Sequence, residues 1–325
     1  MQLNELKQQM TLPVIMAPMF LISNPRMVIE ACNAGIIGSF PALNVRTTEK
    51  LDEWMGEIKS ELEQRKEQNP GRKIAPWAIN FISHRTNKRF TEDLQLIEKH
   101  QPPIVITSLG DPSPVVKVVH SYDGIVLSDV TTVKFAKKAL EKGSDGLILV
   151  SNGAGGHAGT LNPIAFVHEI RSFFDGPVIL AGAMSRGEDI LAAKVLGADF
   201  AYMGTQFIAA KESGAGEDYK QMAVDSMIDD IVYTPAFSGI PANYMIPSIV
   251  NAGLNPNHLP ANKKMDFSEL GDPNIRAWKN IWGAGQGVGG VEKVQSIAEI
   301  TEGLLEQYRI AQEKVIRDYN AVVKQ

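Results

Sequence analysis

One stretch guides the interpretation of the whole chain: Gly146-Leu147-Ile148-Leu149-Val150, followed directly by Ser151-Asn152-Gly153-Ala154-Gly155-Gly156-His157-Ala158-Gly159. Its first five residues carry no polar side chain, which is typical of a strand buried on both faces. The next nine hold four glycines around one histidine. Glycine lets the backbone lie close against a ligand, and histidine exchanges a proton near neutral pH. A strand that ends in such a loop predicts a cofactor or substrate platform, with His157 as its catalytic group.

Short apolar runs of the same kind recur over the first two-thirds of the chain, and amphipathic segments separate them. Alternating strands and helices predict parallel pairing through crossover helices. Eight such units at this chain length favour an α/β fold of the TIM-like (β/α)8 barrel type, with a doubly wound sheet as the alternative. The predicted strands are Val14–Ala17, Ile36–Phe40, Ile74–Phe81, Ile104–Thr107, Gly124–Leu127, Leu147–Val150, Val178–Ala181 and Phe200–Met203. The predicted helices include Leu51–Lys66, Val115–Ser121, Thr131–Lys142, Pro163–Phe174 and Glu188–Leu196.

Residues 211–275 break this rhythm, because they carry many Pro, Asn and Met residues and no clear strand signal. We expect them to form a small helical lid domain. It is inserted near the C-terminal end of a barrel that comprises residues 1–210 and 276–325. The segment from Val291 to Gln325 has a helical apolar pattern through Ile297, Leu304 and Tyr308, and it predicts a long helix after the lid.

Composition and charge exclude several classes of protein. The 325 residues are 44% hydrophobic and 21% charged, as in globular proteins, and a net charge of -5 argues against nucleic-acid binding. No run of about 18 apolar residues predicts a membrane span, and Met1–Lys7 lacks the apolar core of a signal peptide. The single cysteine, Cys32, excludes an internal disulfide, and the histidines are not spaced as metal ligands. We expect a cytoplasmic enzyme without a metal, and the sequence leaves its oligomeric state open.

In a barrel of this kind the active site lies at the carboxyl ends of the strands, so the residues that end each run are candidates. Pro18 has no N–H, and such a corner can pass beneath a planar ring. Asn80 offers both a hydrogen-bond donor and an acceptor. For the polar residues, roles in turns or helix caps are the alternative. The candidates after the first five strands are Ala17, Pro18, Met19, Asn80, Thr107 and Asp129.

Glycines also end the last two strands. Gly182-Ala183 and Gly204-Thr205 occur where barrels commonly bind a phosphate through backbone N–H groups, although simple turn glycines are the alternative. Two segments, Gly153–Ala158 and Gly285–Gly290, match the dinucleotide pattern G-x-G-x-x-G/A. The first follows the sixth strand and the second follows no clear strand, whereas the pattern belongs on the first strand of a Rossmann unit. We therefore do not expect a nicotinamide bound in that manner.

These motifs together resemble a known family, the FMN-dependent nitronate monooxygenases, formerly called 2-nitropropane dioxygenases. The similarity covers roughly residues 12–210 and implies a flavin-bearing TIM-like barrel with a small helical domain. The motifs that carry it are Ala17-Pro18-Met19, Ala154-Gly155-Gly156-His157 with Gly159, Leu180-Ala181-Gly182, Leu196-Gly197-Ala198-Asp199, Gly204-Thr205, Trp282 and Ala284-Gly285-Gln286-Gly287.

The resemblance implies a role for most candidates. His157 would face the substrate and remove a proton from acidic nitroalkanes. Ala17, Pro18 and Met19 would line the isoalloxazine ring, whereas Asn80 and Thr107 would contact the flavin or its tail. Gly155 and Gly156 would pass the cofactor closely, while Gly182, Gly204 and Thr205 would hold its phosphate and Gln286 and Gly287 would close the site. With Asp129 and Ala183 added from their positions at strand ends, the predicted FMN-binding residues are Ala17, Pro18, Met19, Asn80, Thr107, Asp129, Gly155, Gly156, Gly182, Ala183, Gly204, Thr205, Gln286 and Gly287.

The chain also departs from the typical family pattern. Phe20 stands where a Gly-Gly pair is usual, Ala158 replaces an arginine, and Ala183-Met184 replaces Gly-Ile. Segments such as Asp129–Thr132 and Gly283–Gly289 look closer to the NADH:quinone reductase branch. We therefore expect an FMN enzyme that uses NADH to reduce a quinone, with oxidation of nitronates by oxygen as the alternative. A third hypothesis is a flavin-free barrel that acts on a sugar phosphate. Its aldol or isomerase chemistry would require a lysine or a pair of carboxylates at the strand ends.

Overall fold

The structure, a computed structural model, describes residues 3–84, 86–259 and 280–323. Eight parallel strands form one sheet in the order β1-β9-β8-β6-β5-β4-β3-β2, and all eight predicted strands are confirmed. The edge strands β1 and β2 meet where Ile37 N donates to Val14 O (3.0 Å) and Met16 N to Ile37 O (2.8 Å). The sheet is therefore a nearly closed barrel, as predicted. Its strands are β1 (Val14–Met16), β2 (Gly38–Pro41), β3 (Trp77–Ile82), β4 (Ile104–Ser108), β5 (Ile125–Val130), β6 (Gly146–Val150), β8 (Val178–Ala181) and β9 (Phe200–Met203).

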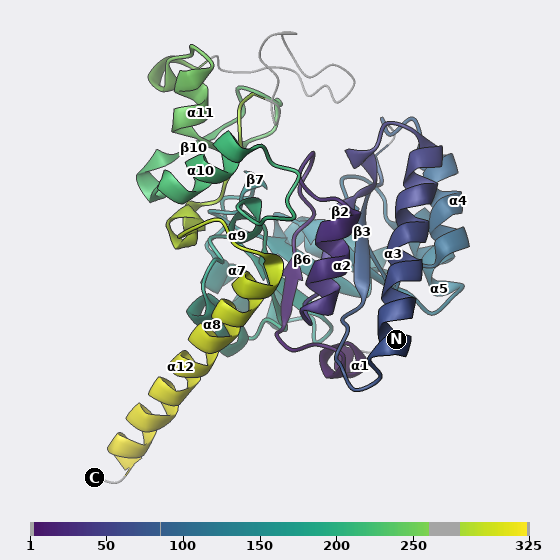
Figure 1. Ribbon diagram of the computed structural model, residues 1–325, viewed down its shortest axis with the longest axis horizontal. Coiled ribbons are helices and arrows are strands. Elements are labelled where there is room, and N and C mark those ends of the chain that lie inside the picture. Colours follow the sequence, from purple (N-terminus) through teal and green to yellow (C-terminus); the bar gives the residue numbers. More distant parts are fainter. Residues whose placement is uncertain (1–2, 85, 260–279, 324–325) are drawn as a thin grey trace.

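Helices cover the outside of the barrel (Figure 1). Side-chain caps begin several of them: Asn24 Oδ1 accepts from Met27 N at 3.0 Å, and Asn162 Oδ1 from Ile164 N at 2.9 Å. The predicted helices are confirmed. The helices of the barrel are α2 (Pro25–Asn33), α3 (Thr48–Gln68), α4 (Phe90–His100), α5 (Ser113–His120), α6 (Val133–Glu141), α7 (Pro163–Arg171), α8 (Gly187–Leu196) and α9 (Thr205–Ile208). Single 3-10 turns are η1 (Ala42–Asn44), η2 (Ile228–Asp230), η3 (Pro256–His258) and η4 (Gln286–Gly290).

Alternation along each strand divides the core into an inner and an outer part. Ile106, Leu127, Ile148 and Ile179 fill the barrel interior, whereas their sequence neighbours pack under the helices. Leu6 of helix α1 (Leu3–Gln8) belongs to the interior cluster and covers the amino ends of the strands. The amino end is thereby filled with apolar side chains, so the polar residues gather at the carboxyl end.

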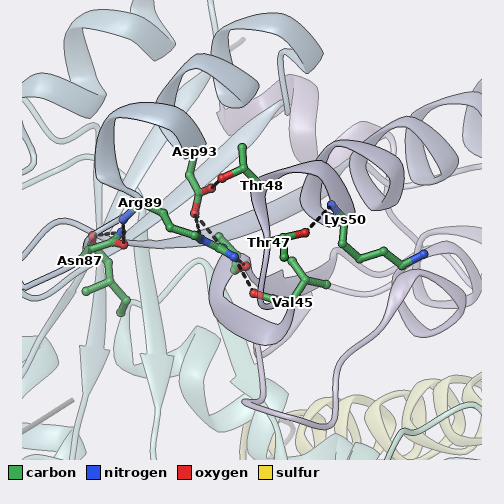
Figure 2. Close-up of polar contacts among 9 residues, drawn as sticks. Val45, Thr47, Thr48, Lys50, Asn87, Arg89 and Asp93 are labelled. Carbon is green, nitrogen blue, oxygen red and sulfur yellow. Dashed lines mark hydrogen bonds and ion pairs between the residues drawn. The ribbon is translucent and has the colours of Figure 1, made fainter. Parts of the chain in front are cut away.

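A buried ion pair fastens the loops that follow β2 and β3 (Figure 2). Arg89 donates from Nε and Nη2 to Asp93 Oδ2 (3.1 and 2.9 Å) and from Nη1 to the carbonyl of Val45 (2.7 Å). Thr48 Oγ1 donates to the other carboxylate oxygen of Asp93 at 3.2 Å. Because Asp93 is fully buried, this pairing supplies the partners that its charge needs. It holds the start of α3 against the start of α4, beside the carboxyl ends of two strands.

The segment predicted as a helical lid contains strands as well, which corrects that prediction. It forms α10 (Glu217–Asp225), β10 (Ile231–Thr234), β11 (Ala242–Met245) and α11 (Ile246–Asn251), grouped on one side of the barrel in Figure 1. Antiparallel pairing joins β10 to β11 and β11 to β7 (Gly156–His157) in a three-stranded sheet. The strands are short, and their partner β7 is distant in sequence, so local patterns do not predict how they pair. Residues 260–275 of the predicted lid, and 276–279 of the return to the barrel, lie outside the described residues.

The long helix predicted near the C-terminus is confirmed as α12 (Ile297–Val323). Its first half packs against α8, where Gly187 N donates to Gln307 Oε1 at 2.8 Å and Leu304 and Tyr308 are buried. Its second half extends away from the barrel (Figure 1). Among the described residues, no helix is long and apolar enough to cross a membrane.

Candidate active site

His157 lies in β7 and is paired with Ala242 of β11. Its Nε2 atom is 3.1 Å from Ser238 Oγ. Ser238 Oγ is also within hydrogen-bond distance of the carbonyl of Ile240 (3.0 Å), of Ile240 N (3.4 Å) and of Tyr244 OH (3.4 Å). The tautomer of the neutral imidazole decides whether its Nε2 donates to this hydroxyl or accepts from it.

Burial lowers the pKa of His157 to about 4, because desolvation disfavours the charged imidazolium. The imidazole is uncharged at neutral pH and is able to accept a proton. Sequence reasoning found His157 but missed Ser238, which follows it by 81 residues. A signal was present: the run Ile231–Thr234, rich in β-branched residues, and the prolines Pro235 and Pro241 are typical of a strand that enters a turn.

The predicted glycine segments meet at the carboxyl end of the barrel. Gln286 N donates to Gly153 O at 2.9 Å, and Gly285 N donates to Thr205 Oγ1 at 2.9 Å. A Cβ atom on Gly155 would lie only 2.9 Å from Gly285 N, so the two backbones touch directly. The loops after β6 and β9 are thus locked to the segment before α12, as the late sequence match implied.

The loop after β8 joins the same junction. Gly182 has a φ of +128°, and a Cβ there would lie 2.2 Å from Ser151 Oγ, so only glycine fits. Ala183 has a φ of +53°, and its N–H donates to Gly153 O at 3.3 Å. A Cβ on Gly287 would lie 2.8 Å from Ala183 O. The predicted phosphate-binding and site-closing residues are therefore neighbours.

Helix α8 follows this loop, and the carboxylate of its own residue Asp189 lies at its N-terminus. Asp189 Oδ2 accepts from Ser185 N and from Arg186 N, each at 2.8 Å. A carboxylate at this position opposes a second negative charge on the same amides. These two amides are therefore already engaged by a side chain of the protein.

Gly156 takes part in the small sheet, opposite Asn243 of β11. Asn243 Nδ2 donates to Ala154 O at 2.7 Å, which ties the glycine-rich loop to β11. Asn243 Oδ1 is buried and has no hydrogen-bond partner within residues 3–84, 86–259 and 280–323. This stretch of the loop is therefore held by residues from the segment predicted as a lid.

Asn80 and Asp129 come together inside the barrel. Asn80 Nδ2 donates to Ser108 Oγ at 2.6 Å and to the carbonyl of Ile106 at 3.3 Å, and Ser108 donates to Asp129 Oδ2. The three polar side chains project inward from β3, β4 and β5, one layer above the apolar interior. They form a polar floor at the carboxyl end of the barrel.

The side chain of Thr107, which was also predicted to contact the flavin or its tail, lies on the opposite face of the sheet. Its hydroxyl is 2.7 Å from Ser128 Oγ, which in turn is 2.7 Å from Ser144 Oγ. These contacts point toward the helix layer, because successive residues of a strand face opposite sides. Ser108, the next residue, is the member of this pair that faces the barrel interior.

Asp129 faces Tyr202 across the polar floor. Asp129 Oδ1 and Tyr202 OH are both buried, and neither has a hydrogen-bond partner among the residues that the structure describes. Burial raises the pKa of Asp129 to about 6, although the hydrogen bond from Ser108 opposes the shift. Burial, together with the charge of Asp129, raises the pKa of Tyr202 well above its ordinary value. Unpartnered buried groups of this kind are satisfied by a ligand or by water.

The residues after β1 lie beside the loop after β9. A Cβ on Gly204 would be 3.4 Å from the Ala17 Cβ and 3.6 Å from Met19 Sδ, which are ordinary contact distances. Met19 N donates to Ser23 Oγ at 2.9 Å, and Met19 O accepts from Asn44 Nδ2 at 3.1 Å. The predicted ring-lining turn, which includes Pro18, is thereby held next to the predicted phosphate loop.

A hollow of about 740 Å³ lies elsewhere, between α10, α11 and Trp282, and its lining includes Asp218, Asp225 and Asn251. None of the predicted site residues lines it. It is therefore separate from the junction around His157 and the polar floor.

Comparison with known proteins agrees with this geometry. The family model described as nitronate monooxygenase matches residues 3–307. A nitronate monooxygenase of Paraburkholderia phytofirmans is 27% identical over 285 residues, 75% of this chain and 76% of that protein. A probable nitronate monooxygenase of Staphylococcus aureus is 27% identical over 270 residues, with 73% and 76% covered.

Solved structures share the fold. Nitroalkane oxidase from Streptomyces ansochromogenes superposes with a TM-score of 0.80 at 21% identity, covering 95% of this chain and 99% of that one. FabK from Thermotoga maritima gives a TM-score of 0.75 at 21% identity, with 97% of each chain covered. These likenesses confirm the TIM-like barrel. Because the family model extends over nearly the whole chain, this protein belongs to the nitronate monooxygenase family.

Proposed function

We propose that the protein is an FMN-dependent oxidoreductase that oxidises NADH and reduces a quinone. The observation that carries the proposal is the junction of four glycine-rich segments beside the polar floor of the barrel. Backbone N–H groups in such loops suit an anionic tail, and inward polar side chains suit the edge of a polar ring. Membership of the nitronate monooxygenase family supports a flavin at this place.

The residues at the carboxyl end of the barrel fit FMN. Asp129 Oδ1 and Tyr202 OH need partners, which favours a ligand with polar groups on its ring. In the proposed enzyme Ala17, Pro18 and Met19 line the ring. Asn80 contacts its polar edge. The residues that pass the cofactor closely, hold its phosphate or close the site are Gly155, Gly156, Gly182, Ala183, Gly204, Thr205, Gln286 and Gly287.

Bound FMN supplies the redox chemistry, because it accepts a hydride from NADH and passes electrons on. The protein contributes binding, orientation and control of protons. His157 is uncharged at neutral pH, since burial lowers its pKa to about 4. It therefore orients the quinone rather than storing a proton for it. The departures from the family pattern at Phe20, Ala158 and Ala183 support the quinone over a nitronate.

Oxidation of nitronates by oxygen is the second candidate, and the state of His157 favours it. Burial keeps the imidazole neutral at neutral pH, and a neutral imidazole holds a basic lone pair on one of its ring nitrogens. Such a group is able to remove the acidic proton of a neutral nitroalkane. A preformed nitronate has already lost that proton and does not need His157.

The visible spectrum of the purified protein under anaerobic conditions, before and after NADH, tests the proposal. Rapid bleaching of a flavin band by NADH, and its return on adding a quinone, is the expected result. A flavin band that is unchanged by NADH but is bleached by a nitronate supports the second candidate instead. A folded protein with no flavin band, even after incubation with FMN, rejects both and favours a flavin-free barrel.

A further inference from the structure

Two short hydrogen-bond chains run side by side on neighbouring strands of the barrel, one on each face of the sheet. The outward chain joins the hydroxyls of Thr107, Ser128 and Ser144. The inward chain runs from Asn80 through Ser108 to Asp129. The outward chain contains only hydroxyl groups, whereas the inward chain ends on a carboxylate.

The carboxylate sets the direction of every bond in the inward chain. Asp129 Oδ2 only accepts when ionised, so the hydroxyl of Ser108 must donate its single proton to it. Ser108 Oγ is then an acceptor toward Asn80, and it lies 2.6 Å from Asn80 Nδ2. The carbonyl of Ile106, which also only accepts, is 3.3 Å from the same nitrogen.

Both hydrogens of the Asn80 side-chain NH2 group are therefore donated in hydrogen bonds. The carbonyl oxygen, Oδ1, is the end of the amide that remains for a ligand, and no described residue donates a hydrogen bond to it. If Ser108 had no acceptor at Asp129, its hydroxyl could donate to Asn80 instead. The amide would then accept that hydrogen bond by turning its oxygen toward Ser108, and its NH2 group would face the site.

We propose that Asp129 is a positioning residue that acts through Ser108 to present the carbonyl oxygen of Asn80 to an N–H group of the bound ligand. This inference rests on the proposed function in one respect, the identity of that ligand. For FMN the matching group is the N3–H of the pyrimidine ring, which is a hydrogen-bond donor.

The first experiment uses the ligand-free protein with 15N-labelled asparagine. The side-chain NH2 signals of Asn80 are identified by their absence in Asn80→Gln, and their hydrogen exchange is measured. We expect protection in the wild type and its loss in Ser108→Ala, which keeps the Asp129 carboxylate. Ser108→Thr retains a hydroxyl and should restore the protection. Ser128→Ala is the matched control, because it breaks the outward chain and should leave Asn80 protected.

The second experiment adds FMN labelled with 15N at N3 to the same variants. The N3–H proton should lie downfield of its position in free FMN when bound to the wild type, Ser108→Thr and Ser128→Ala. In Ser108→Ala it should move back toward free FMN, and affinity should fall by about tenfold, the effect of one hydrogen bond. Asp129→Val should behave in the same way, and it serves as the second variant if Ser108→Ala does not fold.

Two results would overturn the inference. One is an Asn80 amide whose protection is unchanged in Ser108→Ala and Asp129→Val. The other is an equal loss of protection in Ser128→Ala. If the wild type binds no FMN, the proposed function fails, yet exchange in the ligand-free protein still decides whether Asp129 orients Asn80.

Discussion

The barrel end and the small three-stranded sheet hold the two halves of the candidate site in different ways. At the barrel end, Asn80, Ser108 and Asp129 sit on adjacent parallel strands, and hydrogen bonds within the barrel connect them. In the small sheet, His157 depends on Ser238, which reaches it from a hairpin 81 residues further along the chain. In the proposed enzyme the cofactor contacts would therefore come from the repeating unit, whereas the histidine proposed to face the substrate depends on a later segment.

The largest effect is expected at the glycine junction of the barrel. Gly182→Ala places a Cβ 2.2 Å from Ser151 Oγ on a backbone with a φ of +128°. Strain and overpacking together should lower the free energy of unfolding by about 4 kcal/mol and weaken flavin binding. Urea denaturation measures the first effect and flavin fluorescence the second. Gly289→Ala is the control, since its added Cβ would meet nothing within 4 Å. Equal destabilisation of both variants would contradict the argument.

The next effect concerns the small sheet and separates binding from proton removal. His157→Asn should reduce oxidation of neutral nitroalkanes by at least about 10²-fold, because it removes the proton acceptor. Oxidation of preformed nitronates, and flavin content, should change by no more than about twofold if His157 acts only as a base. Steady-state oxygen consumption with both substrates measures this. An equal loss on both substrates means that His157 does not act as the base.

The two regions should also respond to pH with opposite signs. His157 has a folded pKa of about 4, below its ordinary 6.5, so the unfolded state binds more protons between these values. The free energy of unfolding therefore rises with pH across this window, by an amount on the order of 3 kcal/mol.

Asp129 has a folded pKa of about 6, above its ordinary 3.8, so the native state binds more protons between them. Its contribution to stability is present at low pH and is lost as the pH rises through 6, again on the order of 3 kcal/mol. The two contributions nearly cancel in the wild type, so denaturation from pH 4 to 7 should show a fall in stability with pH only for His157→Asn. Asp129→Asn should show a rise instead. The same slope in all three proteins would refute both assignments.

The smallest effect is expected from the partner of His157. Ser238→Ala removes the hydroxyl that lies 3.1 Å from His157 Nε2 but leaves the imidazole in place. One neutral hydrogen bond corresponds to a loss of about fivefold in kcat/KM on neutral nitroalkanes. The pH dependence of kcat should shift as well, because Ser238 helps to determine which nitrogen carries the proton. A loss as large as that of His157→Asn would mean that the hairpin, and not the histidine, controls the chemistry.

Much of the barrel end was predictable because its features are local. Each strand is a short apolar run, and its last polar or glycine residue marks the carboxyl end. Thr107 shows where this reasoning stops. Ile104–Thr107 is apolar on both faces, so its period of two does not say which face is inward, and a one-residue change moves the side chain to the other side of the sheet. The limits of the predicted lid, residues 211–275, stay a prediction.

Sequence patterns predicted the eight strands, the parallel order that their helices impose, the glycine-rich strand ends and His157 as the candidate proton acceptor. Folding was needed to show that Ser108 faces inward, that β10 and β11 add a sheet to β7, and that Ser238 lies beside His157. The two groups of features differ in how far apart in the chain the interacting residues are. Periodicity and turn chemistry act over a few residues, whereas the direction of a hydrogen bond or the partner of a short strand is decided by groups that folding brings together from distant parts of the chain.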